Sequence, residues 1–427
     1  MTIDELEREI KDVYLLNDTG VIRIMLATII ANKISPGGKP VWLMLLAGSS
    51  SGKTALLQTL DKIGDWIITV DTLTTNTFAS GLQRSEETSL LWKANHGILV
   101  FKDFTTITSM NEEGLKEIMG QLRAIYDGTF DKKTGNNVDT AWHGKIGIIG
   151  GGTISVQRKM RQYSENGERF INYIIGQADP IEVTHRAIKN QKNLKEKEEL
   201  LAELVGEFVR GKLETAPDET MRIPQDIINE MVEVANFTTL ARSPVLTDSK
   251  TGQVVFVPDR EMPPRVAMMF TNMAMTLMHI SNETELSRQN SLILYKCGMD
   301  SIPVDRRMIL RLLAQFKHAT TKNLAIKLNY PTDPIRNWCN QLNALKMITR
   351  VQSGKNDIWT LKPEYKKTVL KYENLIESEQ ELEPTQEELM MSGLQEEEGG
   401  GYDDNGIDEK LLGQIDIGKS QQLLDEF

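Results

Sequence analysis

A run of small, polar and basic residues early in the chain has the composition of a phosphate-binding loop. It is AGSSSGKT. Successive backbone N–H groups of such a loop point at anionic oxygens, the lysine reaches the outer phosphates of ATP, and the last hydroxyl holds Mg²⁺. Lys53 is therefore the expected phosphate ligand and Thr54 the expected magnesium ligand. The loop residues predicted to bind ATP are Ala47, Gly48, Ser49, Ser50, Ser51, Gly52, Lys53 and Thr54.

The loop departs at one position from the pattern G-x-x-x-x-G-K-[ST]. Ala47 stands at the first glycine position, and Gly48 follows it. Small residues still occupy the places where the backbone must turn. Val41 to Leu46 is expected to be a buried strand, and a helix is expected over Lys53 to Leu60. The order strand, loop, helix favours a phosphate site over its alternative, a chance match in a Ser/Gly loop.

An acidic residue follows another apolar segment. Ile98 to Phe101 is expected to be a strand, and Lys102 and Asp103 come directly after it. P-loop ATPases place an acid there to hold magnesium and its water, so Asp103 is the predicted magnesium ligand. Phe104 stands where a catalytic glutamate is often found, which leaves the general base unassigned. If Lys102 fills the usual acid position, Asp103 would itself be the base; a simple strand cap is the third alternative.

Two more polar residues lie at the ends of expected strands. A fourth strand is expected over Lys145 to Ile149, and Thr153, after a run of glycines, would orient the attacking water. A fifth strand is expected over Phe170 to Ile175, with the guanidinium of Arg169 at its start. A second strand is expected at Trp66 to Val70. The candidate catalytic residues are Lys53, Asp103, Thr153 and Arg169.

Composition limits the class of protein. The chain has 427 residues, 40% hydrophobic and 26% charged, which fits two or three folded domains. No apolar run approaches the roughly 20 residues of a membrane helix, and the start of the chain lacks an apolar signal core, so a cytoplasmic protein is expected. Cys297 and Cys339 lie 42 positions apart, which excludes a zinc ribbon and predicts buried thiols.

Charge is distributed unevenly. The chain carries a net charge of -11, but Glu373 to Phe427 holds 17 acidic and two basic residues and so accounts for -15. The preceding 372 residues therefore sum to +4, a balance that permits DNA binding. The acidic segment has few aromatic residues and is expected to be disordered, because it cannot bury enough apolar area to offset chain entropy.

Several segments together resemble a known family. AGSSSGKT, GILVFKDFTTI, QLRAIYDGTF, GKIGIIGGGT and GERF follow one another in this order. They resemble the AAA+ ATPases of phage and mobile-element replication modules and, distantly, the minichromosome-maintenance helicases. The resemblance covers roughly residues 15 to 275. It implies a parallel sheet between helices with the strand order 5-1-4-3-2.

The resemblance also implies roles for individual residues. GERF lies in the place of the SRF motif, so Arg169 is expected to be an arginine finger that reaches the ATP of a neighbouring subunit; a surface arginine with a local ion pair is the alternative. Lys132 and Lys133 lie where these motors carry a pore hairpin and would grip DNA phosphates, unless the hairpin is merely solvated. Arg265 matches the lid arginine that senses nucleotide, with a structural arginine as the alternative.

Two further parts are expected after this core. Residues 186–300 are helical by apolar spacing, with a hairpin at 249–256, and are expected to form a lid. In residues 301–370 a helix, a short helix, a longer helix and two strands follow in the order of a winged helix. Its third helix would enter the major groove. The residues expected to contact DNA there are Arg336, Asn337, Asn340 and, on the wing, Lys355. A winged helix that makes only protein contacts is the alternative.

The last seven residues, QQLLDEF, contain part of a sliding-clamp-binding pattern. Gln421, Leu424 and Phe427 have the spacing Q-x-x-L-x-x-F. Such peptides are presented in disordered tails, so contact with a sliding clamp is a hypothesis here, and a chance match is its alternative.

These observations combine into one interpretation. The chain is expected to be an α/β protein with a P-loop AAA+ core in residues 1–185, a helical lid in 186–300, a winged helix in 301–370 and an acidic tail in 371–427. It is expected to be an ATP-dependent DNA helicase or translocase of phage or mobile-element replication, acting as a homo-oligomeric, hexameric ring in a bacterial cytoplasm. The alternatives are an ATP-switched helicase loader or initiator and a non-motor DNA-binding regulator.

Overall fold

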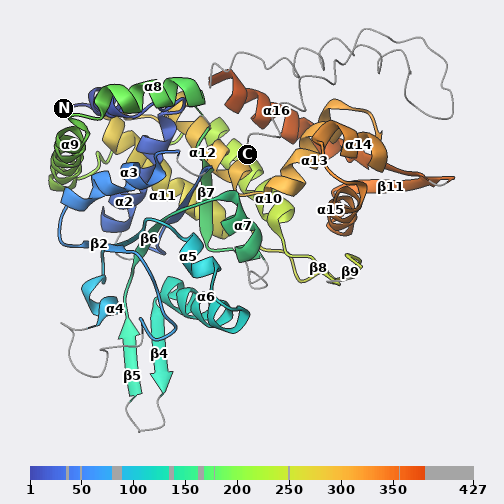
Figure 1. Ribbon diagram of the computed structural model, residues 1–427, viewed down its shortest axis with the longest axis horizontal. Helices are drawn as coiled ribbons and strands as arrows, with labels where there is room; N and C mark the ends of the chain where they lie inside the picture. Colours follow the sequence, from blue (N-terminus) through green and yellow to red (C-terminus); the bar gives the residue numbers. More distant parts are fainter. Residues whose placement is uncertain are drawn as a thin grey trace. The chain divides into compact units, whose positions relative to one another are not determined.

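Five apolar segments pair side by side as one parallel sheet in the computed structural model (Figure 1). They are β1 (Trp42–Leu46), β2 (Ile67–Val70), β3 (Ile98–Phe101), β6 (Gly147–Gly152) and β7 (Phe170–Ile174). The strand order is β2-β3-β6-β1-β7. Two intervening strands, β4 (Thr129–Lys133) and β5 (Asp139–His143), form a separate hairpin. Without them the order is 5-1-4-3-2 counted from the other edge, so the predicted topology is confirmed.

The structure describes most of the first 379 residues. The described ranges are 1–34, 38–48, 51–78, 89–133, 139–161, 168–176, 178–248, 251–354 and 356–379. The predicted clamp-binding residues Gln421, Leu424 and Phe427 lie outside these ranges, as do Ser49, Ser50 and Lys355.

The central strands are apolar along their whole length. All residues of β1 and of β3 are buried, and their sequences, WLMLL and ILVF, do not alternate with polar residues. Such runs are typical of parallel strands that helices cover on both faces. In the register of the sheet, Leu46 at the end of β1 lies beside Gly152 of β6 and Ile174 of β7. The carboxyl ends of these three strands therefore meet at one edge.

The sequence misplaced the fourth strand of this sheet. It was predicted over Lys145 to Ile149, whereas β6 begins at Gly147 and includes the glycine run up to Gly152. The glycines belong to the strand because neighbouring groups come too close for side chains. A Cβ at Gly151 would lie 2.8 Å from the carbonyl oxygen of Lys102. Small residues here allow the end of β3 to lie against β6.

Helices surround the sheet. The helix α2 (Gly20–Ile34) is apolar on all sides and buried from Gly20 to Asn32, and it packs against β1, β6 and α11 (Pro264–Ser281). A helix that is hydrophobic all round is typical of a protein interior. The other helices up to residue 300 are α1 (Ile3–Val13), α3 (Lys53–Gln58), α4 (Leu90–Lys93), α5 (Thr105–Thr108), α6 (Glu112–Asp127), α7 (Ile154–Arg161), α8 (Pro180–Asn190), α9 (Leu194–Glu214), α10 (Gln225–Arg242) and α12 (Arg288–Asp300), with one 3-10 turn over Thr59–Lys62.

The hairpin predicted at 249–256 is present between α10 and α11. Its strands are β8 (Leu246–Thr247) and β9 (Val254–Phe256), which pair antiparallel. Its strand β9 packs against a helix of the C-terminal part, α15 (Thr332–Ala344).

The C-terminal part combines helices with a small antiparallel sheet. Its elements are α13 (Val304–Gln315), β10 (Ala319–Thr320), α14 (Thr321–Leu328), α15 (Thr332–Ala344), β11 (Ile348–Ser353), β12 (Asn356–Leu361) and α16 (Pro363–Glu379). The sheet order is β10-β12-β11. Thr320 caps the short helix α14, because its hydroxyl accepts a hydrogen bond of 3.1 Å from the N–H of Asn323. The longer helix, α15, ends at Ala344.

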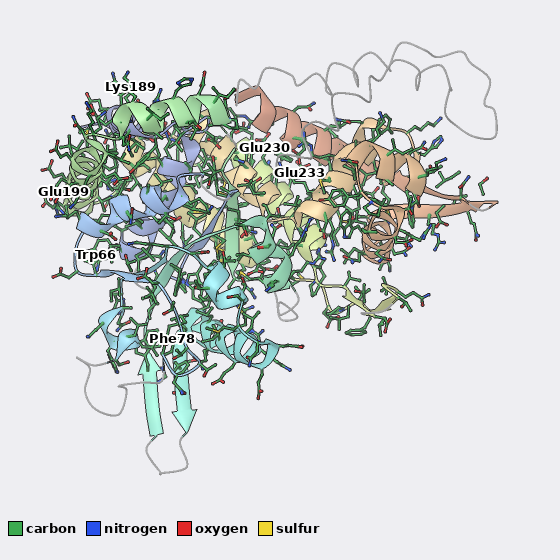
Figure 2. The ribbon with its side chains drawn as sticks, viewed as in Figure 1. Trp66, Phe78, Lys189, Glu199, Glu230 and Glu233 are labelled. Carbon is green, nitrogen blue, oxygen red and sulfur yellow. The ribbon has the colours of Figure 1, made fainter. Side chains whose placement is uncertain are left out.

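The last described helix corrects the predicted start of the acidic tail. The tail was expected from residue 371, but α16 continues to Glu379 and its residues Tyr372 and Glu373 are buried. The hydroxyl of Tyr372 donates to Glu233 over 2.9 Å, and Lys371 lies 3.0 Å from Glu230. Figure 2 labels both glutamates on α10. These contacts and the two ion pairs of Glu373 with Arg307 and Arg311 explain why the helix continues into an acidic sequence.

Both cysteines are buried and free, as predicted. Cys297 lies in α12 and Cys339 in α15. Burial raises the pKa of both thiols above its ordinary value.

Among the described helices, none combines the length and the apolar character needed to cross a membrane.

Candidate functional site

The predicted phosphate loop leaves the sheet at the carboxyl end of β1. The N–H of Ala47 donates to the carbonyl of Gly152 over 3.1 Å, which holds the start of the loop beside the end of β6. Gly52 precedes α3 with a φ of 78°, a conformation that glycine adopts without strain. The hydroxyl of Ser51 donates to the carbonyl of Gly48 over 2.9 Å. Strand, loop and helix thus occur in the predicted order.

Lys53 lies over this loop. Its ammonium group donates to the carbonyl oxygens of Ala47 and Gly48 at 3.2 and 2.8 Å. Partial burial lowers the pKa of Lys53, and the negative charge of Asp103 opposes this effect. The next residue, Thr54, is exposed at the start of α3. A cation and a hydroxyl are therefore available at the same loop.

Asp103 lies at the same edge of the sheet, two residues after β3. Its carboxylate accepts a hydrogen bond of 2.9 Å from the N–H of Thr105 and another from the Thr105 hydroxyl. The preceding Lys102 turns toward Asp61, with 3.6 Å between its ammonium and the carboxylate. Asp103 therefore provides an exposed carboxylate whose charge acts on Lys53.

Phe104, in the position of the expected glutamate, belongs to the hydrophobic core. Its ring is fully buried and makes edge contacts with Phe101 and Phe170 at centroid distances of 5.5 and 5.7 Å. Its N–H donates to the carbonyl of Gly151 over 2.6 Å. A side chain at this position points inward, so a carboxylate there would be buried among aromatic rings.

Thr153 completes the group at the carboxyl edge. It follows β6 directly and precedes α7, and its hydroxyl shares a hydrogen bond of 2.7 Å with Ser155. The same helix is tied to the C-terminal part, because the side chain of Gln157 donates to the carbonyl of Asp300 and accepts from the N–H of Val304. The structure therefore brings Lys53, Asp103 and Thr153 to one edge.

Arg169 lies at the opposite edge, at the amino end of β7. Its guanidinium lies 3.8 Å from the carboxylate of Asp127 and 5.6 Å from the ring centre of Tyr126. Its side chain is 11% exposed. The strand places Arg169 beside the start of β1, whereas the phosphate loop follows the end of β1.

Arg265 was predicted to sense nucleotide from the lid, and the structure places it beside Arg169. It lies in the first turn of α11, donates to the carbonyl of Glu168 over 3.2 Å, and its guanidinium lies 6.0 Å from the ring centre of Tyr126. Burial and the nearby charge of Arg265 both lower the pKa of Arg169. Because α11 begins at the amino edge of the sheet, Arg265 lies away from the phosphate loop of its own chain, and its nucleotide-sensing role stays a prediction.

A third arginine, Arg242, connects α10 with β7 and Glu261 at this edge, and no sequence pattern pointed to it. Arg242 is buried at the end of α10 and forms two hydrogen bonds with the carboxylate of Glu261, at 2.9 and 2.8 Å. It also donates to the carbonyl of Phe170 over 3.1 Å. Burial raises the pKa of the neighbouring Glu168 carboxyl, and Arg242 opposes this increase. Its partners are far away in sequence, so no local pattern could identify it.

The predicted DNA contacts are only partly described. Lys132 and Lys133 lie in β4 of the predicted hairpin, and the positions of their side chains lie outside the described part. Arg336 is exposed on α15, with its guanidinium 2.9 Å from Asp333 and 3.8 Å from Asp357. Asn337 and Asn340 lie on the same helix and line a groove together with Arg336.

Comparisons with known proteins leave the family open. No family model matches the chain, and no curated protein matches it.

Proposed function

We propose that this protein is a P-loop ATPase of the AAA+ type that assembles into a ring and couples ATP hydrolysis to movement on DNA. The observation that carries the proposal is the gathering of Lys53, Asp103 and Thr153 beside the phosphate loop, at the carboxyl edge of a sheet with the order β2-β3-β6-β1-β7. Ligands of open α/β sheets bind at the carboxyl ends of the strands.

The groups at this edge fit ATP and Mg²⁺. Lys53 supplies a cation, Thr54 a hydroxyl and Asp103 an exposed carboxylate, which are the donors that a magnesium nucleotide requires. When bound, the nucleotide supplies the phosphoryl group and the metal spreads its charge. Lys53 would neutralise the outer phosphates and Asp103 would hold the metal or its water. Thr153 would orient the attacking water with its hydroxyl.

The arginines at the amino edge are assigned to a neighbouring subunit. The five residues of β1 separate the two edges, which corresponds to about 16 Å of extended chain. Arg169 is fixed by Asp127 and Tyr126, so it does not reach the phosphate loop of its own chain. Arg169 and Arg265 would instead stabilise the charge that develops on the nucleotide of the next subunit. Each site would then need two chains, as in a ring.

The proposal that DNA is the partner rests on elements outside the central sheet. The order of α13, α14, α15, β11 and β12 fits a winged helix, and the hairpin of β4 and β5 fits a pore hairpin. The first 372 residues carry a net charge of +4. The assignment to phage or mobile-element replication, the hexameric state and the contact with a sliding clamp rest on the sequence resemblance alone.

One observation favours a second candidate, an ATP-switched helicase loader or initiator. The burial of Phe104 leaves no carboxylate directly after Asp103. Asp103 would then serve both the metal and the water, and hydrolysis would be slow. Weak turnover without strand separation would favour this candidate over a motor.

ATP turnover in a mixture of two inactive variants tests the proposal. Lys53→Ala and Arg169→Ala should each abolish turnover, while Lys62→Ala, an exposed lysine nearby that pairs with Glu203, should not. Mixing the two inactive variants should restore part of the activity, because some interfaces then combine an intact loop with an intact arginine. Turnover and fork unwinding are measured with and without single-stranded and forked DNA. Failure of the mixture to recover activity would show that Arg169 does not act on a neighbour.

A further inference from the structure

A polar groove of about 790 Å³ lies between the hairpin of β8 and β9 and the helix α15. The hairpin forms one wall with Thr251, Gly252, Gln253 and Val254, and α15 forms the other with Asp333, Arg336, Asn337, Asn340, Asn343 and Ala344. Arg350 of β11 also lines it. The helix residues recur at spacings of three and one, so they share the face opposite the buried Ile335, Cys339 and Leu342.

Four carboxamides converge in this groove. They belong to Gln253 on the hairpin and to Asn337, Asn340 and Asn343 on the helix. Each amide offers two donors and one acceptor. Within the described part of the chain, none of these four side chains forms a hydrogen bond with another residue. The groove therefore presents a row of paired donors and acceptors to a ligand.

The two arginines of the groove contribute little net charge. Arg350 lies 2.7 Å from the carboxylate of Asp357, and Arg336 is paired with Asp333 and Asp357. With both arginines compensated, the ligand would be recognised by hydrogen bonds more than by its phosphates. Asparagine and glutamine amides pair with the N6 and N7 edge of adenine, which is the base whose donor and acceptor pattern they match.

The hairpin restricts the form of nucleic acid that can enter. It lies so close to α15 that a Cβ at Gly252 would come 2.2 Å from the amide nitrogen of Asn337. A helix with its side chains is about 10–12 Å across, and the major groove is about 12 Å wide. The helix alone would fill the major groove, and the helix with the adjoining hairpin would not fit. A single strand is narrower than a duplex, so it is the form of DNA that matches a groove of about 790 Å³ beside this contact.

We propose that the groove between the hairpin of β8 and β9 and the helix α15 binds single-stranded DNA and selects adenine through its four carboxamides. This inference rests on the proposed function, because it names the form of DNA that the C-terminal part of the ATPase holds. It differs from the expectation that α15 enters the major groove of a duplex, since the hairpin lies against α15 at Gly252 and Asn337.

The test is the binding of labelled oligo(dA), oligo(dT) and a mixed-sequence duplex to the full chain, measured by fluorescence anisotropy without nucleotide. The wild type should prefer oligo(dA), and the double variant Asn340→Ala/Asn343→Ala should bind it about tenfold more weakly while its affinity for oligo(dT) stays the same. Asn323→Ala, on α14 outside the groove, is the matched control. Because few phosphates are contacted, the affinity should fall only slightly with added salt.

A second variant removes the hairpin wall. Replacing residues 246–256 with a short Gly-Ser linker should abolish the preference for adenine and increase the affinity for the duplex, and circular dichroism melting checks that the variant folds. Equal affinity of the wild type for oligo(dA) and oligo(dT), or an unchanged oligo(dA) affinity in the double variant, would overturn the proposal. ATP turnover without DNA is measured in parallel. If turnover persists while the groove variants have no effect, the inference fails and the proposed ATPase stands.

Discussion

The two edges of the central sheet hold their polar residues in different ways. At the carboxyl edge, the hydrogen bonds of the Lys53 ammonium group to described residues all go to its own loop, and Asp103 is exposed. At the amino edge, Arg169 lies near Asp127 and Arg265 near Glu261, both lie over the ring of Tyr126, and Arg242 is buried. The carboxyl edge leaves its polar groups available to a ligand. The amino edge fixes the orientation of its arginines before any partner binds. We infer that the amino edge is built to present its arginines rigidly to another chain.

The largest expected effect is the loss of stability when the buried Arg242 is replaced, compared with the same change at Arg265. Arg242→Leu should lower the free energy of unfolding by about 3–5 kcal/mol, because Glu261 would be left buried without its cation and Glu168 would lose an opposing charge. Arg265→Leu, the matched change at a partly exposed position, should cost less than about 1 kcal/mol. Urea denaturation measures both. Equal losses would mean that the two arginines have the same structural role.

The next effect is a loss of ATP turnover when Asp103 at the carboxyl edge is replaced. Asp103→Asn should reduce ATP turnover by about 100-fold or more, because the amide can neither hold the metal as an anion nor accept a proton. Nucleotide binding should persist, since Lys53 and the loop are unchanged. Asp61→Asn, which removes the partner of Lys102, is the control. If both variants lose turnover to the same degree, Asp103 has no special role.

A smaller effect on turnover tests the ring of Tyr126, which both Arg169 and Arg265 contact. Tyr126→Leu should lower turnover about fivefold, because each guanidinium loses a cation–π contact worth roughly 0.5–1 kcal/mol. Tyr126→Phe should behave like the wild type, since the buried hydroxyl makes no hydrogen bond with any described residue. Loss of turnover in the Phe variant would instead point to the hydroxyl.

The smallest effect is a pH dependence of stability at the amino edge. Burial lowers the pKa of Lys145 from 10.5 to about 8. The unfolded chain therefore binds more protons than the folded chain between these values, and stability should rise as the pH increases from about 8 to 10. The gain should be on the order of 1 kcal/mol, and Lys145→Met should remove it. Thermal unfolding across this range measures the slope, and the same slope in both proteins would contradict the assignment.

The sequence predicted the sheet better than the tertiary contacts of the arginines. Apolar runs and the phosphate-loop pattern were enough to place Lys53, Asp103 and Thr153 at strand ends, because each lies within a few residues of its strand. The place of Arg265 depends on where α11 begins relative to β7, a tertiary contact without a local pattern. The same holds for Arg242 and for the burial of Phe104.

The groove between the hairpin of β8 and β9 and the helix α15 could not be predicted for the same reason. A helix with asparagines on one face could be recognised in the sequence, and Asn337 and Asn340 were selected as DNA contacts. The covering hairpin could be predicted as a hairpin, but its contact with α15 joins residues more than 80 positions apart. Hydrophobic periodicity identifies elements and their buried faces, and it does not tell which elements meet.

The burial of both native cysteines makes the chain suitable for attachment of optical probes. Cys297 and Cys339 are fully covered, and their raised pKa values keep them as unreactive thiols at neutral pH. A cysteine introduced at an exposed position would therefore react selectively with a maleimide dye, without removal of the native residues. Two such labels, on the hairpin and on α14, would report their separation in single molecules while DNA enters or leaves.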